Sequence, residues 1–188
     1  MLLRESVKQA VFIERDGVLV QTRTDEQNHQ VGPVTLSEFQ MNQAAVPFLR
    51  RLRAIGFVLI ATTNQPGLSD GTQSRRELDR MHELLRKTFP LHDIMVCPHE
   101  PADGCPCRKP KPGLLIEAAF EHRLALDRSF VISDKWQDAQ AARMVGCTSL
   151  LVDSPWIGNA HRDFVLPNVA AVVDKILLLQ ESHRLAAA

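Results

Sequence analysis

Two acidic residues, Glu14 and Asp16, stand two positions apart in the sequence AVFIERDGVLV. The four residues before Glu14 are apolar, and a short apolar run bounded by polar residues is typical of a buried strand. Two carboxylates at the end of a strand can bind a magnesium ion and take part in phosphoryl transfer. Such a site needs further polar residues elsewhere in the chain.

Polar residues follow two other apolar runs. FVLIATT leads into Asn64, and SFVIS leads into Asp134. Asn and Asp are also ordinary turn formers, but their recurrence after three apolar runs favours one shared site. Glu14, Asp16 and Asp134 could therefore converge on one Mg²⁺, which prefers oxygen ligands.

Two more side chains could act on a phosphoryl group at this site. Thr63 supplies a hydroxyl group, and Lys109 supplies a positive charge for the phosphoryl oxygens, which become more negative during transfer. Together with the acids, these residue types indicate magnesium-assisted phosphoryl transfer.

A second metal site is indicated by the sequence CPHEPADGCPC. It places Cys97, His99, Cys105 and Cys107 in a C-x-H…C-x-C pattern, whereas the fourth cysteine of the chain stands alone in an apolar segment. Three sulfurs and one imidazole complete a tetrahedral Zn²⁺ shell with no open position, so such a zinc is structural. The alternative is a cluster of reduced cysteines with an incidental histidine.

The elements that would position these residues alternate along the chain. Apolar runs and helical spacing, bounded by Gly, Pro and N-cap signals, predict strands and helices in turn, and the polar stretch 21–33 is expected to be a loop. The expected strands cover residues 10–13, 57–63, 93–97, 129–134 and 148–153, and the expected helices cover residues 43–55, 72–89, 113–122, 138–146 and 168–182.

Strands that alternate with helices predict a parallel sheet covered on both faces. In such α/β sheets, ligands bind beyond the carboxyl ends of the strands. The three polar strand ends described above would lie there, which supports the interpretation of a shared site.

Composition limits the class of protein. The 188 residues are 45% hydrophobic, enough for one domain spanning residues 1–188, and the 22 basic residues balance the 22 acidic ones. We therefore expect no nucleic-acid or membrane partner, and no apolar run approaches the roughly 18 to 20 residues of a membrane span. The N-terminus lacks the apolar region of a signal peptide, so we expect a cytoplasmic protein, and we expect a monomer.

Four segments together resemble the signature motifs of the haloacid dehalogenase (HAD) superfamily of phosphatases. They are VFIERDGVLV at 11–20, TNQPG at 63–67, CRKPKPG at 107–113 and SDKWQD at 133–138. The resemblance extends over about residues 10–155 and is greatest to the subgroup of D-glycero-D-manno-heptose 1,7-bisphosphate phosphatases and histidinol-phosphatases. It implies a Rossmann-like α/β fold, a zinc-binding loop and dependence on Mg²⁺. The chain has no room for a large cap domain.

The resemblance also implies roles for individual residues. Glu14 occupies the position of the nucleophile, Asp16 that of the general acid and base, and Thr63 and Lys109 would bind the transferring phosphoryl group. The remaining expected residues are substrate contacts at Arg15, Asn64, Gln65, Arg108 and Lys135, Mg²⁺ ligands at Glu14, Asp16 and Asp134 with Asp138 beside them, and zinc ligands at Cys97, His99, Cys105 and Cys107.

This sequence departs from the family pattern in two places. Glu14 stands where the family has aspartate, and one extra methylene moves the attacking oxygen by about 1 Å or more if the backbone stays in place, a misplacement that can cost about 10²-fold in rate. Val20 and the stretch QTRTDEQNHQ stand where the heptose enzymes carry an asparagine and an Asp-His-Gly-Tyr-like stretch. The first departure bears on the rate of phosphoryl transfer, and the second bears on which substrate is bound.

Other residues of reactive type receive simpler interpretations. We expect the histidines outside the zinc loop, including His82, to lie at the surface, and Trp136 to pack at the rim of the site.

The leading hypothesis is a Mg²⁺-dependent phosphatase acting on a small sugar or polyol phosphate, closest in type to heptose 1,7-bisphosphate 7-phosphatase. The alternative is an impaired relative that binds a phosphorylated ligand without efficient turnover. A third hypothesis, an interaction module built on the zinc loop, leaves the acids at the strand ends unexplained.

Overall fold

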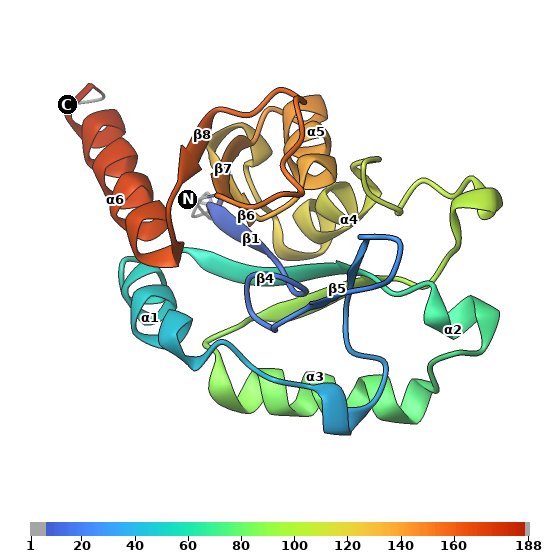
Figure 1. Cartoon of the computed structure of the whole chain (residues 1–188). Coiled ribbons are helices and arrows are strands. Elements are labelled where there is room, and N and C mark those ends of the chain that lie inside the picture. The colour runs from blue at the N-terminus through green and yellow to red at the C-terminus, as the bar shows by residue number, and fades with distance from the viewer. Residues whose placement is uncertain (1–6, 187–188) are drawn as a thin grey trace.

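The computed structural model describes residues 7–186, apart from the side chains of residues 183 and 186. A six-stranded sheet forms the centre of the fold, in the order β5-β4-β1-β6-β7-β8 (Figure 1). Every neighbouring pair in this sheet is parallel, which confirms the predicted architecture. The strands are β1 (Ala10–Glu14), β4 (Val58–Asn64), β5 (Asp93–Cys97), β6 (Phe130–Ser133), β7 (Thr148–Val152) and β8 (Phe164–Leu166).

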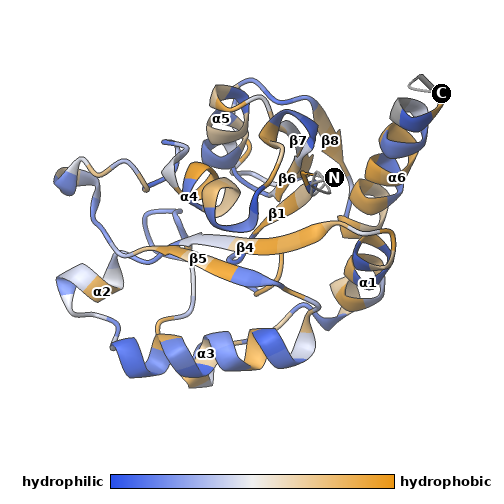
Figure 2. Cartoon of the chain, turned by 180° about the vertical axis from the view of Figure 1, so that it is seen from behind, coloured by the Kyte–Doolittle hydropathy of each residue, from blue (hydrophilic) through white to orange (hydrophobic). Residues whose placement is uncertain are grey.

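Helices cover both faces of the sheet. Alternate residues of β1 point to opposite faces, so Val11 and Ile13 join a core with α1, α3 and α6, whereas Ala10 and Phe12 join a core with α4 and α5. Figure 2 shows the sheet strands as largely hydrophobic and α3 as largely hydrophilic. The helices are α1 (Val46–Ala54), α2 (Gly67–Asp70), α3 (Arg75–Thr88), α4 (Gly113–His122), α5 (Trp136–Met144) and α6 (Val169–Ala186).

The stretch 21–33 differs from the expected loop. It contains a short antiparallel hairpin of β2 (Arg23–Thr24) and β3 (Gln30–Val31). After the hairpin, Gly32 passes so close to the site that a Cβ atom there would lie 2.8 Å from the Asp16 carboxyl carbon. The segment that follows the hairpin therefore lies against Asp16, just beyond the carboxyl end of β1.

The other expected helices and strands begin and end within a few residues of the predicted bounds. Ser74, one of two candidate N-caps, caps α3 by accepting a hydrogen bond of 3.1 Å from the Glu77 N–H. α5 begins at Trp136, two residues before the expected start, and both α2 and β8 were missed because they are only four and three residues long. Within residues 7–186, no helix is long and apolar enough to cross a membrane.

Candidate active site

A cavity of about 370 Å³ lies at the carboxyl ends of the strands. The parallel register aligns Glu14 with Thr62 on β4, so the polar residues after β1 and β4 meet at the same edge of the sheet. Of the expected site residues, those that line the cavity are Glu14, Asp16, Asn64, Gln65, Arg108, Lys109, Lys135 and Asp138.

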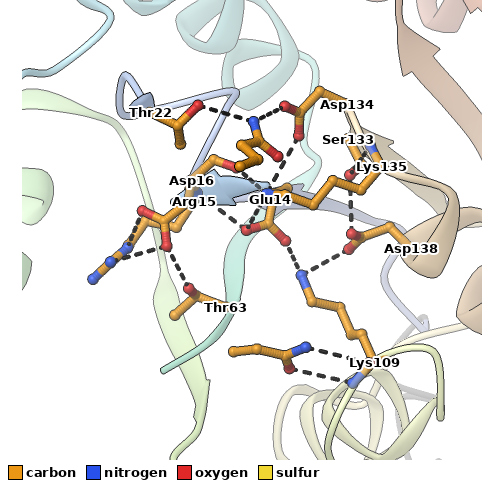
Figure 3. Close-up of polar contacts among 12 residues, drawn as sticks. Glu14, Arg15, Asp16, Thr22, Thr63, Lys109, Ser133, Asp134, Lys135 and Asp138 are labelled. Atoms are coloured by element: carbon orange, nitrogen blue, oxygen red, sulfur yellow. Dashed lines mark hydrogen bonds and ion pairs between the residues drawn. The ribbon is translucent and has the colours of Figure 1, made fainter. Parts of the chain in front are cut away.

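Glu14 is held by two lysines (Figure 3). Its Oε2 atom is paired with Lys109 Nζ, and its Oε1 atom lies 3.3 Å from Lys135 Nζ. Lys109 Nζ also lies 2.8 Å from Asp138 Oδ1. Burial lowers the pKa of Lys109, and the Asp138 carboxylate opposes that effect. The extra methylene of Glu14 therefore leaves its carboxylate in contact with the residue expected to bind the phosphoryl group.

Asp16 is fixed by four hydrogen bonds. Arg15 donates from Nε to Oδ1 at 2.8 Å and from Nη2 to Oδ2 at 2.9 Å. Gln65 Nε2 donates to Oδ2 at 2.7 Å, and Thr63 Oγ1 donates to the same oxygen at 3.2 Å. Burial alone would raise the pKa of Asp16, but Arg15, Lys135 and Gln65 together hold it below the usual value. The free protein thus keeps this acid as a carboxylate.

Arg15 does not lie where a substrate contact was expected. It is fully buried and is not part of the cavity wall, because its guanidinium group is held by the Asp16 carboxylate and lies beside His82. Thr63 is also fully buried and is connected to the site through Asp16 and Gln65, with its hydroxyl donating to the first and accepting from the second.

His82 on α3 is buried behind Arg15, which corrects the expectation of a surface position. Its Nε2 atom lies 3.3 Å from Arg15 Nη1. A guanidinium group only donates hydrogen bonds, so Nε2 accepts and the imidazole is neutral. Burial and Arg15 lower the pKa of His82 to about 4, which agrees with that assignment.

Three oxygen atoms surround the ammonium group of Lys135. Asp16 O accepts a hydrogen bond from Nζ, while Glu14 Oε1 lies at 3.3 Å and Asp134 Oδ1 at 3.5 Å. Asp134 Oδ1 is buried and has no hydrogen-bond partner among the described residues. These oxygens are the donor type that Mg²⁺ prefers, and a cation already lies among them, so the residues fit a magnesium ion.

The three expected Mg²⁺ ligands do not all reach this position with a carboxylate. In the described part of the chain, the carboxylates of Glu14, Asp16 and Asp134 do not form a group with ligand atoms within 4.8 Å of one another. Asp16 offers its main-chain oxygen to the cation position, because its carboxylate is held by Arg15. Two other segments contact the Asp134 carboxylate. Gly17 (φ +109°) lies so close that any Cβ atom there would clash with it, and the Gln30 amide donates a hydrogen bond to Oδ2.

The four predicted zinc ligands come together. The Sγ atoms of Cys97, Cys105 and Cys107 lie 3.2–3.7 Å from one another, and His99 Nδ1 lies 3.6 Å from Cys97 Sγ and 3.2 Å from Cys107 Sγ. A tetrahedral zinc shell with Zn–S of about 2.3 Å requires sulfur separations of about 3.8 Å. The cluster is therefore close to the size that a zinc ion requires.

The cysteine-rich loop is joined to the active site by its last residues. Arg108 Nη1 donates to His99 O at 2.8 Å. Lys109 N donates to Asn64 Oδ1 at 3.2 Å, and Asn64 Nδ2 donates to Lys109 O at 3.3 Å. Asn64 thus anchors the backbone of Lys109 to the end of β4, a role beyond the expected substrate contact.

Comparison with known proteins agrees with this geometry. The HAD-hydrolase-like family model matches residues 106–176. D-glycero-beta-D-manno-heptose-1,7-bisphosphate 7-phosphatase of Helicobacter pylori strain J99 is 33% identical over 180 residues, covering 91% of this chain and 98% of the relative. The Pseudomonas aeruginosa protein of the same name is 32% identical over 147 residues, covering 76% and 79%.

A solved structure shows the same fold. It is D,D-heptose 1,7-bisphosphate phosphatase from B. bronchiseptica, complexed with magnesium and phosphate, with a TM-score of 0.75 and 28% identity over 92% of this chain and 99% of that chain. The chain therefore belongs to the HAD-like phosphatases, a class of phosphoric monoester hydrolases. Within that class, its relatives include heptose 1,7-bisphosphate 7-phosphatases and the bifunctional HisB proteins of histidine biosynthesis.

Proposed function

We propose that this protein is a Mg²⁺-dependent phosphatase that hydrolyses a small sugar or polyol phosphate and is closest in type to heptose 1,7-bisphosphate 7-phosphatase. The observation that carries the proposal is the contact of Glu14 with both Lys109 and Lys135 in one cavity at the strand ends. A carboxylate beside two ammonium groups can meet a phosphoryl group whose oxygens need positive charge.

Glu14 is the proposed nucleophile. Its carboxylate attacks phosphorus, the bond to the leaving oxygen breaks, and water then cleaves the glutamyl-phosphate. Lys109 turns from Glu14 toward the phosphoryl oxygens as their charge grows, and Asp138 keeps it charged. Arg108, which also lines the cavity, is the proposed contact for the rest of the substrate.

Asp16 is the proposed general acid and base. It protonates the leaving oxygen and later takes a proton from the attacking water. Since its lowered pKa leaves it a carboxylate in the free protein, Asp16 must first take up a proton, from solvent or from the bound phosphate group, before it can give one to the leaving oxygen. Thr63 and Gln65 position the carboxylate during this change.

The proposed Mg²⁺ ligands are Glu14 Oε1, Asp16 O and Asp134 Oδ1, and the ion supplies positive charge that stabilises the phosphoryl oxygens. Cys97, His99, Cys105 and Cys107 would hold a structural zinc that fixes Arg108 and Lys109.

The alternative function is binding of a phosphorylated ligand without efficient turnover. The favouring observation is that Lys109 is already paired with Glu14, so the longer side chain competes with the phosphoryl group for the same ammonium.

Phosphate release from a panel of sugar and polyol phosphates tests the proposal. The chain and its Asp16→Asn variant are compared with and without Mg²⁺, and we expect release by the unaltered chain alone, dependent on Mg²⁺. Saturable binding of a panel member without release above the variant would establish the alternative.

A further inference from the structure

A second cavity, of about 440 Å³, lies beside the first. Gln30, Lys135 and Gln137 line both cavities, so the two cavities adjoin at these residues. The second cavity is also lined by Trp136 and Trp156, and these are the two tryptophans of the whole sequence. It is therefore a neighbouring space to consider for the part of a substrate that is attached to the phosphoryl group.

Hydrogen bonds through the Ser154 hydroxyl and the main chain tie both tryptophans to the strand end that carries Asp134. Ser154 Oγ donates to Asp134 O at 2.5 Å, and Trp156 N donates to Ser154 Oγ at 3.1 Å. Trp136 N then donates to Trp156 O at 3.2 Å. Gly158, at φ +53°, brings the same loop against the Trp136 side chain. The tryptophan cavity is therefore held in a fixed relation to the proposed magnesium position.

The residues of this cavity combine aromatic surface with polar groups. Both tryptophans are half-buried. Gln137 Oε1 is buried and has no hydrogen-bond partner within residues 7–186, so a hydroxyl donor from a ligand would satisfy it. Pockets that bind small molecules commonly have this composition of aromatic walls with a few polar groups.

The aromatic walls of this cavity favour a sugar ring over an open-chain polyol. Aromatic faces carry partial negative charge, and one face of a pyranose presents C–H groups with partial positive charge while its hydroxyl groups project from the edge. An open-chain polyol has the same hydroxyl groups but no fixed apolar face, and it loses more conformational entropy when it is bound.

We propose that the tryptophan cavity is the leaving-group subsite and that it binds the pyranose form of a sugar phosphate in preference to an open-chain polyol phosphate. The orientation of the ligand rests on the proposed phosphatase function, with the phosphoryl group at Glu14 and the sugar ring against Trp136 and Trp156. The tryptophan cavity thus narrows the proposed substrate from a sugar or polyol phosphate to a sugar phosphate in its pyranose form.

Tryptophan fluorescence provides a direct test, because the chain has two tryptophans and no tyrosine. The probes are mannose 6-phosphate and its reduced, open-chain counterpart mannitol 1-phosphate, which share carbon number and phosphate group. Rapid mixing with the Mg²⁺-loaded protein records the signal before turnover. We expect a saturable fluorescence change with mannose 6-phosphate, at an affinity about tenfold higher than for mannitol 1-phosphate.

Variants show whether the fluorescence change comes from the tryptophan cavity. Trp156→Ala should weaken mannose 6-phosphate binding about tenfold, and Trp156→Phe should restore most of the affinity. Inorganic phosphate should compete with the probe equally well in the Trp156→Ala variant and in the unaltered chain, because it binds in the first cavity. Phe120→Ala is the matched control, because Phe120 is 87% exposed on α4 and lines neither cavity. Unchanged melting temperatures would show that the variants fold.

Equal affinity for the two probes, no saturable fluorescence change, or unchanged binding by Trp156→Ala would each overturn the subsite. Failure of the phosphatase function gives a different result. In that case no phosphate is released, but the preference for the ring and the effect of Trp156→Ala remain.

Discussion

Lys135 Nζ lies 3.3 Å from Glu14 Oε1, and Asp16 O and Asp134 Oδ1 complete the oxygen atoms around it. An ammonium group therefore stands where the proposed mechanism requires a divalent cation. Binding of Mg²⁺ to the same three oxygens would displace this ammonium group, because the ion would occupy the space that Nζ now fills and the two positive charges repel each other.

Replacing Lys135 by methionine should therefore tighten Mg²⁺ binding, by about tenfold, since the variant removes a competing positive charge. Titration calorimetry measures the affinity. Lys87→Met, which changes an exposed lysine near the end of α3, should leave it unchanged. Weaker Mg²⁺ binding by Lys135→Met would show that the ammonium group does not compete for this position.

Asp134→Asn should abolish Mg²⁺ binding while the fold is retained. The change removes the charge of a carboxylate whose buried Oδ1 has no hydrogen-bond partner within residues 7–186, and the residue lies at the end of β6 rather than in the hydrophobic core. Calorimetry with Mg²⁺ and circular dichroism measure the two effects. Asp153→Asn, at an exposed position just after β7, is the matched control, and an unchanged affinity in Asp134→Asn would contradict the assigned site.

The purified protein should contain about one zinc ion per chain. Its removal by a chelator should impair the phosphate site more than global stability, because the loop fixes Arg108 and Lys109. Metal analysis gives the content, and inorganic phosphate binding with a thermal melt gives the two consequences. Protein prepared without chelators that contains no zinc would contradict this assignment.

The pH dependence of stability should report His82. Its pKa is about 4 in the folded protein, against 6.5 as the ordinary value, so the unfolded chain binds more protons in that range. The free energy of unfolding should therefore fall as the pH drops through this window, by about 2 kcal/mol between pH 7.5 and pH 5 from this residue. The effect of Asp16 lies at lower pH, since its pKa is below 3.8.

His82→Gln provides the comparison for that measurement. Glutamine keeps an acceptor for Arg15 but cannot be protonated in this range, so urea unfolding of the variant should show about 2 kcal/mol less loss over the same interval. The other histidines contribute equally to both proteins. Identical pH dependence of the two proteins would show that His82 is not buried beside Arg15.

Residues with strong local signals could be predicted from the sequence. The bounds of β5 (Asp93–Cys97) and α4 (Gly113–His122) match the expected ranges, because each is bounded by turn or helix-start residues. The strand-end acids and the four zinc-loop residues also follow from local pattern. β2 and β3 could not be found in this way, since a two-residue strand has no periodicity.

Contacts between distant segments account for the remaining differences. His82 meets Arg15 across 67 residues, and no local pattern in α3 distinguishes it from a surface histidine. The position of Arg15 also depends on this contact and on its pairing with Asp16, because it lies in the turn after β1, where strand alternation no longer applies. The second cavity depends on the approach of Trp156 to Trp136, which the spacing between them does not reveal.

Glu14→Asp tests the central claim, that the site is a phosphatase site with glutamate in the position of the nucleophile. Steady-state phosphate release from a sugar phosphate is measured for both proteins at saturating Mg²⁺. We expect slow but measurable release by the unaltered chain and a gain of about 10²-fold in the variant, because the shorter side chain restores the reach of the attacking oxygen. Slower release by the variant would show that Glu14 is a working nucleophile in its own geometry, whereas no release by either protein would contradict this account.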